Sequence, residues 1–112
     1  PVGAGTLAVL SERGAGLLIG VDTDWSAPTA YPESAEFILA SALKNMDKWV
    51  QDTIKQVITG DFAGENYLGT LENGGVGLGY SSAWADQVPA DLKAEIEALL
   101  ADIIAGNIQT MP

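Results

Sequence analysis

The sequence of 112 residues contains no cysteine and no histidine. Without cysteine the chain has neither disulfide bonds nor a thiolate metal site, and without histidine it lacks the commonest general base and zinc ligand. These two absences disfavour an enzyme, and we expect neither a resident metal nor another cofactor.

Basic residues are also scarce. Five Lys and Arg residues stand against fifteen Asp and Glu residues, which gives a formal net charge of -10. Such a field repels phosphate backbones and anionic lipid surfaces, so nucleic acid and membrane-surface partners are not expected. No apolar run approaches the roughly 20 residues that span a bilayer. The 47% hydrophobic content is sufficient for the core of one compact domain.

The chain begins with Pro1, and residues 1–6 have the composition of a loop that enters a helix. We therefore expect a fragment or a processed product. The small residues Gly3 and Gly5 could let backbone N–H groups at the start of the helix approach a ligand oxygen. A tight turn that needs small residues is the simpler explanation, because Gly3-x-Gly5 lacks the full dinucleotide-binding fingerprint.

Hydrophobic periodicity predicts an α/β chain of three helices and four strands. Helices are expected over residues 6–13 and 46–59 and from Pro89 to a stop at Gly106, and strands over residues 15–21, 37–43, 65–71 and 76–80. The order of these elements favours a parallel sheet. We expect the apolar stripes of the two longer helices to lie in the core, with Trp49 packed on the sheet. Residues 72–75 (ENGG) predict a turn between the last two strands.

Two carboxylates, Asp22 and Asp24, directly follow the apolar run at residues 17–19. A buried strand that ends in this way carries its acidic residues at the carboxyl edge of a sheet, where open α/β proteins bind small polar ligands. Lys44 follows the next predicted strand. For Asp22 and Lys44 an ion pair between neighbouring strand ends is an alternative to ligand contact, and Asp24 could equally cap a turn.

Several segments together resemble the C-terminal part of one family. These are residues 20–24 (GVDTD), 40–47 (ASALKNMD) and 74–78 (GGVGL), followed by the helix that opens at residues 88–89 (VP). The pattern is similar to that of the BMP family, the basic membrane lipoprotein-type substrate-binding proteins of ABC transporters, which include purine nucleoside receptors. The resemblance runs through essentially all 112 residues in order.

The resemblance implies a type I periplasmic binding protein fold, in which two α/β lobes close on a ligand. Residues 1–112 would be a C-terminal fragment of such a two-lobed protein, comprising part of the C-terminal lobe plus the hinge-crossing segments, with a parallel sheet flanked by helices. It further implies an extracytoplasmic solute-binding component, periplasmic or anchored as a lipoprotein, that does no chemistry and delivers a nucleoside or related small polar ligand to an ABC permease.

The same resemblance assigns roles to particular residues. Asp22 occupies the position whose carboxylate hydrogen-bonds the ribose hydroxyls in nucleoside-binding members, and Lys44 the position whose ammonium reaches the ligand. The segment that contains Gly3 and Gly5 occupies the Gly-rich position near the ligand, although its sequence is not the usual one. Trp25 stands where Gln or Gly is common, as a stacking surface or a lid. We add Asp24 as a candidate ligand contact.

Two other functions are open on the sequence alone. Asp22 and Asp24, two residues apart at a strand end, could serve a metal-dependent hydrolase, although no third ligand has a recognisable spacing. Alternatively the chain is an assembly module: if its lobe is incomplete, apolar surface must be covered by another copy or by the missing part of the protein.

Overall fold

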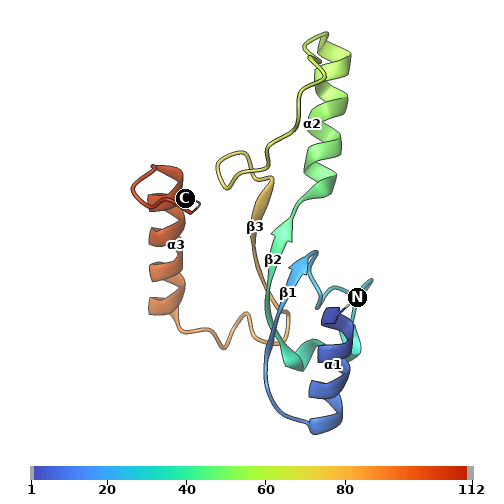
Figure 1. Cartoon of the computed structure of the whole chain (residues 1–112). Coiled ribbons are helices and arrows are strands. Elements are labelled where there is room, and N and C mark those ends of the chain that lie inside the picture. Colours follow the sequence, from blue (N-terminus) through green and yellow to red (C-terminus); the bar gives the residue numbers. More distant parts are fainter. Residues whose placement is uncertain (1, 111–112) are drawn as a thin grey trace.

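A computed structural model describes residues 2–110 of the chain. The elements follow in the order α1 (Val2–Arg13), β1 (Leu18–Asp22), the 3-10 helix η1 (Pro32–Phe37), β2 (Ile38–Lys44), α2 (Met46–Thr59), β3 (Val76–Tyr80) and α3 (Ala90–Ile104) (Figure 1). The α/β class is confirmed: helices flank a small sheet that contains a parallel strand pair.

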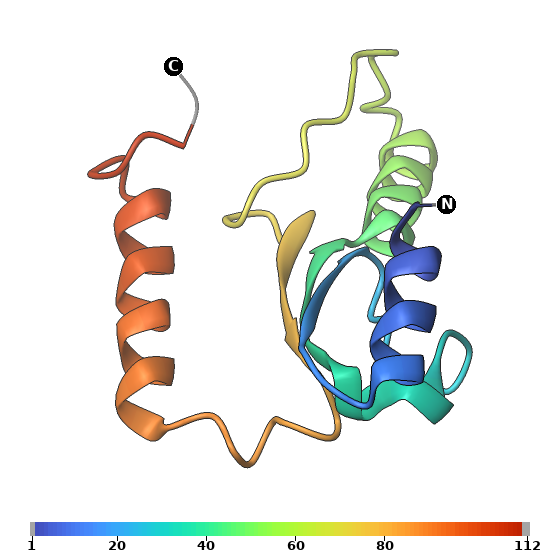
Figure 2. The ribbon, with the colours of Figure 1, turned by 60° about the horizontal axis from the view of Figure 1, so that its bottom comes forward.

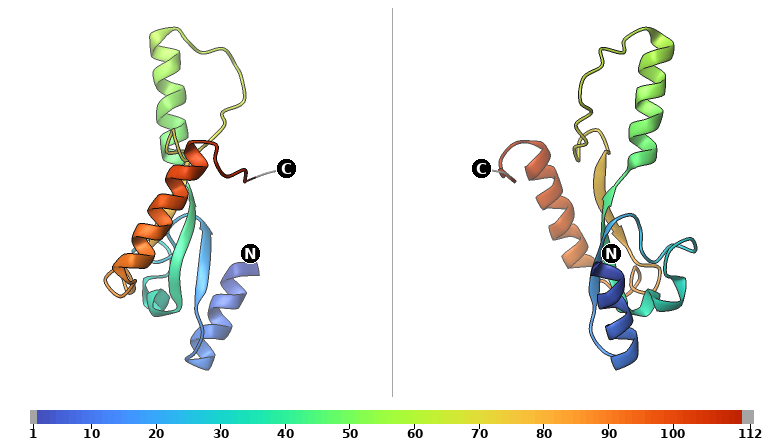
Figure 3. Two further views of the ribbon diagram at one scale, coloured as in Figure 1. Left: turned by 90° about the vertical axis from the view of Figure 1, so that its left-hand side faces the viewer. Right: turned by 45° about the vertical axis from the view of Figure 1, so that its right-hand side comes forward.

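The described strands form one sheet in the order β1-β2-β3. β1 and β2 are parallel, with Asp22 opposite Leu43, whereas β2 and β3 are antiparallel, with Lys44 opposite Val76. The parallel pairing that we expected is confirmed for β1 and β2, and β3 adds an antiparallel strand to the sheet. The reason is the course of α2, which continues beyond the end of β2 instead of packing back on the sheet (Figures 1 and 3). After α2 the chain re-enters the sheet at the same end where β2 finishes, so β3 runs antiparallel to β2.

Three elements lie where periodicity and turn chemistry predict them. α2 has its expected bounds and ends at Gly60, whose left-handed φ of 81° is readily adopted by glycine. β3 also has its expected bounds, and β2 is shifted by one residue. Asn45 directly precedes α2, but its side chain does not cap the helix. Its Nδ2 donates to the carbonyl oxygen of Gly74 at 2.8 Å.

Helix α1 begins earlier than expected, at Val2, so the loop predicted around Gly3 and Gly5 is wrong for the described residues. Pro1 lies outside them. Glycine is a weak helix former, and a short helix needs tertiary packing to form. Here Leu7 is only 3% exposed, and Gly3 abuts the indole of Trp25. This packing explains why the helix extends through two glycines.

The predicted strand over residues 65–71 is wrong, because the structure has no regular element there. Asn73 explains the difference. Its Oδ1 accepts hydrogen bonds from the N–H groups of Thr70 (2.8 Å) and Gly75 (2.9 Å), and its Nδ2 donates to the carbonyl oxygen of Leu68 (2.8 Å). Backbone groups bound in this way are not available for pairing with a neighbouring strand. The expected turn before β3 does form.

The core is small and lies between α1, η1 and the sheet. Its buried apolar side chains in the described part of the chain are those of Leu7, Ile38 and Ala40, and the buried hydroxyls of Ser41 and Ser81 lie beside them. Both hydroxyls are used: Ser41 Oγ accepts from the N–H of Trp25, and Ser81 Oγ donates to a carbonyl oxygen of η1.

The two longer helices do not contribute their apolar stripes to this core, contrary to expectation. The exposed large apolar side chains of these helices are Met46, Trp49, Val50, Ile54, Val57 and Ile58 on α2 and Leu92, Leu99 and Ile104 on α3. Instead of packing on the sheet, Trp49 stacks on Tyr67, with ring centroids 6.0 Å apart. α2 projects away from the sheet (Figures 1 and 3), and α3 stands apart from the strands in Figures 1 and 2. Among the described residues, no helix is long and apolar enough to cross a membrane.

Candidate functional site

The carboxyl ends of β1 and β2 bring Asp22 and Lys44 together. Because the two strands are parallel neighbours, their ends share one edge of the sheet. Asp22 Oδ1 lies 2.9 Å from Lys44 Nζ, and the two side chains are 50% and 66% exposed. The sequence predicted this pairing of strand ends, and the structure places an exposed ion pair there.

Asp22 has a left-handed backbone conformation, and one of its carboxylate oxygens is shielded from solvent. Its φ of 73° lies in the left-handed region, which Asp tolerates better than most side chains. Although the side chain is half exposed, Oδ1 itself is shielded from solvent and accepts no hydrogen bond within residues 2–110, so that the Lys44 ammonium is its charge partner. Backbone strain of this kind is concentrated at binding and active sites.

Asp24 serves the turn that follows β1. Its Oδ1 accepts hydrogen bonds from the N–H (2.9 Å) and the Oγ–H (2.7 Å) of Ser26. Ser26 is 5% exposed, and its Oγ in turn accepts from the N–H of Ser82 at 3.3 Å. One oxygen of Asp24 is thus already occupied by a local motif, the alternative left open by the sequence.

The indole of Trp25 packs against glycines of two elements. A Cβ at Gly3 of α1 would lie 2.3 Å from Trp25 Cη2, and a Cβ at Gly20 of β1 would lie 2.6 Å from Trp25 Cγ. Trp25 Nε1 donates to the carbonyl oxygen of Val21 at 2.9 Å, and the Tyr31 ring lies 5.3 Å away, centroid to centroid. Both glycines are therefore required by the position of this one side chain.

Gly5 behaves differently from Gly3. It lies on an exposed part of α1, and a Cβ there would meet no atom within 4 Å. We expected backbone N–H groups of this segment to approach a ligand oxygen, and in the structure Gly3 lies against Trp25. Sequence reasoning missed the other partners of Trp25, Tyr31 and Ser41, because a lone aromatic residue in a loop and a serine in a strand carry no distinctive signal.

Three hollows among the described residues meet at the ion pair. One of about 360 Å³ is lined by Asp22, Asp24 and Lys44. Another of about 650 Å³ shares Asp22 and is also lined by Gly3 and Trp25. A third of about 400 Å³ shares Lys44. Each volume is within the range of small-molecule sites. Asp22 lines the first two hollows, and Lys44 lines the first and the third.

Metal ligands do not gather at this edge. In the part of the chain that the structure describes, no three acidic side chains lie close enough to hold a metal ion together. The arrangement at Asp22 and Lys44 offers a hydrogen-bond acceptor beside a donor, which suits recognition of hydroxyl and carbonyl groups.

A separate polar cluster lies along α2. Lys48 Nζ is 2.7 Å from Asp52 Oδ2, and the hydroxyl of Tyr67 donates to the same oxygen at 3.2 Å. The hydrogen bond from Lys48 is the main cause that lowers the pKa of Asp52, and the same bond raises the pKa of Lys48. The pKa of Tyr67 is raised, first by desolvation and then by its hydrogen bond to Asp52.

No family model and no curated protein matches the chain. Among solved structures, the chain is similar to an ABC transporter solute-binding protein from Conexibacter woesei, with a TM-score of 0.60 and 21% sequence identity. The match covers 95% of this chain and 40% of that protein, so the chain spans less than half of its length. The likeness shows that the α/β fold is that of part of a solute-binding protein. It does not extend to the BMP family or to a ligand.

Proposed function

We propose that the chain is part of the solute-binding component of an ABC importer and contacts a nucleoside or related small polar ligand through Asp22 and Lys44. The single observation that carries the proposal is the exposed ion pair at the carboxyl edge of β1 and β2, where three hollows meet. The fold of a solute-binding protein, shared over 95% of the chain, supports the same role. A binding protein of this kind is no enzyme and needs no cofactor.

The chemistry of the pair suits a ribose. A carboxylate accepts hydrogen bonds from two vicinal hydroxyls, and an ammonium donates to a hydroxyl, a ring nitrogen or a carbonyl oxygen. An exposed ion pair contributes only about 0–1 kcal/mol to stability, so a ligand can replace it at little cost. Gly3 and Trp25 line the hollow that Asp22 shares, which is where a base could lie against the indole. Asp24 lines the hollow between the strand ends. Gly5 has no part in this proposal.

The remaining parts of the proposal concern the whole protein. Residues 1–112 are the C-terminal fragment of a two-lobed protein, which acts outside the cytoplasm and hands its ligand to a membrane permease. Lobe closure around the ligand stabilises the bound state when both lobes contact it. Because this chain offers one side of such a cleft, it should bind the ligand more weakly than a two-lobed protein does.

Calorimetric titration of the 112-residue chain with adenosine, guanosine and ribose tests the proposal. We expect saturable binding of a nucleoside, and a loss of about tenfold or more in affinity for Asp22→Asn and for Lys44→Met, since each removes a charge-assisted hydrogen bond. Asparagine is chosen because it tolerates the left-handed backbone at this position.

Matched controls remove the same charges elsewhere. Glu97→Gln on α3 and Lys55→Met on α2 change exposed residues that line none of the three hollows. They should leave the affinity unchanged. If all four variants bind the nucleoside like the unaltered chain, the pair is a structural ion pair and the proposal is wrong.

One observation favours the second candidate, an assembly module. Val50, Ile54, Val57 and Ile58 of α2 expose more than half of their surface on one side of a helix. Soluble proteins rarely leave such a stripe uncovered. Either the rest of a two-lobed protein or a second copy of the chain would cover it, and the concentration dependence of the mass in solution separates the two. The metal-dependent hydrolase receives no comparable support.

A further inference from the structure

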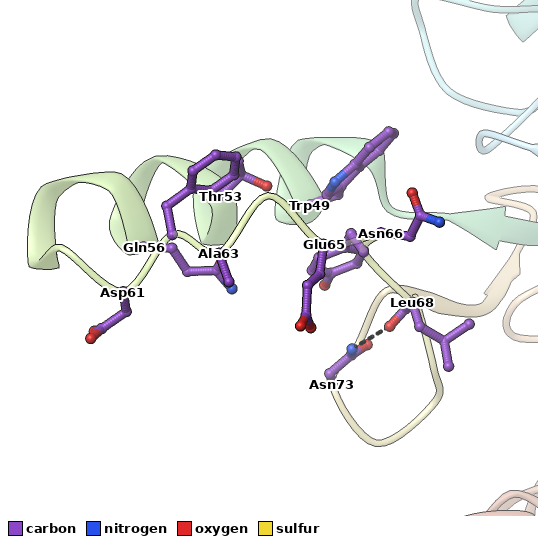
Figure 4. A pocket seen from close by; sticks show the side chains of 11 residues that line it. Trp49, Thr53, Gln56, Asp61, Ala63, Glu65, Asn66, Leu68 and Asn73 are labelled. Atoms are coloured by element: carbon purple, nitrogen blue, oxygen red, sulfur yellow. Dashed lines mark hydrogen bonds between the residues drawn. The ribbon is translucent and has the colours of Figure 1, made fainter.

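We propose that the groove between α2 and residues 61–73 is a second small-molecule site, and that it binds a small organic cation of the alkylammonium class. The groove has a volume of about 570 Å³, and its helical wall is formed by Trp49, Thr53 and Gln56 (Figure 4). Asp22 and Lys44 do not line it. Trp49 and Tyr67 line both this groove and the hollow at Lys44, so the two sites are neighbours that differ in their charged residues.

Three aromatic side chains line the groove: Trp49, Phe62 and Tyr67. The Trp49 and Tyr67 rings are stacked, with planes 28° apart, and the hydroxyl of Tyr67 is held by Asp52. Because Trp49 and Phe62 are 48% and 52% exposed, their ring surfaces are open to a ligand. The negative faces of aromatic rings attract cations, and groups of such rings recognise quaternary ammonium ions.

The charged side chains that line the groove are all acidic. Asp61 and Glu65 are acidic, and no lining residue is basic. Figure 4 shows the two carboxylates on the same side of the returning chain. Lys48, one residue before Trp49 on α2, is paired with Asp52 at 2.7 Å, so its charge is offset. With a net charge of -10 on the whole chain, the local field favours a cation over an anion.

The C-terminal part of the far wall, residues 68–73, is held in place by hydrogen bonds of one side chain. Asn73, which lines the groove, binds Leu68, Thr70 and Gly75 through its side chain. Gly64 adopts a φ of 71° where the chain turns back toward the sheet. Order in this part of the wall saves part of the entropy cost of ordering a loop on binding.

Choline provides the probe, and 3,3-dimethylbutan-1-ol, a molecule of the same shape without the charge, provides the matched comparison. The indole N–H signal of Trp49 and the amide signals of residues 61–68 are followed by NMR during titration of the 112-residue chain. We expect saturable shifts at these positions with choline, and an affinity about fivefold lower for the neutral alcohol, because it lacks the cation–π attraction.

Variants locate the site and keep the test independent of folding. Trp49→Leu should abolish saturable choline binding, and Glu65→Gln, a change of one exposed carboxylate, should weaken it about threefold, the loss of one screened charge interaction. Glu95→Gln on α3 should have no effect, and excess adenosine should not displace choline. The proposal is overturned if choline and the neutral alcohol bind equally, or if Trp49→Leu, still folded by circular dichroism, binds choline as before.

Discussion

Gly3 and Gly5, both near the start of α1, differ in the space around them. A methyl group at Gly3 would collide with Trp25, whereas a methyl group at Gly5 would point into open space. We expect Gly3→Ala to lower the free energy of unfolding by about 1–3 kcal/mol, the usual cost of forcing an extra carbon into a packed contact. Gly5→Ala should raise it by about 0.5–1 kcal/mol, because alanine is the better helix former.

Urea unfolding followed by circular dichroism measures both changes. The two variants add the same atoms to the same helix, two residues apart, so each serves as the control for the other. Equal effects would mean that Trp25 does not pack on Gly3.

The polar cluster on α2 gives a prediction about pH. Asp52 has a pKa lowered from its ordinary value of 3.8, so its contribution to stability is present above that value and is lost as the pH falls through the lower pKa of the folded state. Lys48 and Tyr67 have pKa values raised from 10.5 and 10.0, so their contributions are lost as the pH rises through the higher pKa values of the folded state. The cluster should therefore be intact between about pH 4 and pH 10.

The chain has three tyrosines, and Tyr67 is the one that bonds Asp52, so the difference between the tyrosinate absorbance titrations of the unaltered chain and Asp52→Asn checks this cluster. In Asp52→Asn the pKa of Tyr67 should fall toward its ordinary value, because the carboxylate that accepts its hydrogen bond is gone. Desolvation remains and should keep part of the shift. A Tyr67 titration identical in both proteins would refute the hydrogen bond.

For single residues, the sequence predicted those contacts that depend only on the order of the strands. Asp22 and Lys44 end two neighbouring parallel strands, and the same order brings the side chains together. The position of Trp25 was not predictable, because it depends on how residues 23–31 fold back over Gly20 and on a hydrogen bond to Ser41 from another strand. Contacts made by tertiary packing leave no local pattern.

Among the elements, α2 shows what periodicity can and cannot predict. A helix forms through contacts between residues three and four apart, so its bounds follow from local sequence. An apolar stripe indicates that a face favours burial, but it does not say what covers the face. We placed the α2 stripe on the sheet, and the structure leaves it exposed.

The exposed stripe should be tolerant to polar substitution in the monomer. We expect Ile54→Gln and Ile58→Gln to change the free energy of unfolding by no more than about 0.5 kcal/mol, as surface changes do. Ile38→Ala, at a fully buried position, should cost about 2–5 kcal/mol. Denaturant unfolding at low protein concentration compares the three, and a large loss for Ile54→Gln would mean that α2 packs against another part of the chain.

The conformation of the segment before β3 is held by hydrogen bonds of the Asn73 side chain and not by pairing with a strand. Asn73→Ala removes three hydrogen bonds to the backbone and should cost about 1–3 kcal/mol. Hydrogen exchange at the amides of Thr70 and Gly75 should accelerate. Asn73→Asp keeps the acceptor and should protect these two amides better than Ala does. Slow exchange in the Ala variant would show that the turn is held by other contacts.

Seen as a whole molecule, the chain combines high net charge with exposed apolar stripes. The charge of -10 opposes self-association, and the stripes favour it. Salt screens the charge without weakening the apolar contact. We therefore expect sedimentation to show monomers at low ionic strength and a larger average mass at high ionic strength and high concentration. The double variant Ile54→Gln/Ile58→Gln should stay monomeric, and a mass independent of salt in both proteins would refute this balance.

We propose that Asp22 and Lys44 form one side of a nucleoside-binding cleft. Backbone NMR spectra of the 112-residue chain during an adenosine titration test this cleft, because the amides report where the ligand lies. We expect saturable shifts at residues 22–25 and 43–45, and their loss in Asp22→Asn. Shifts that are absent, or that gather on α3 and persist in Asp22→Asn, would mean that Asp22 and Lys44 do not bind the nucleoside.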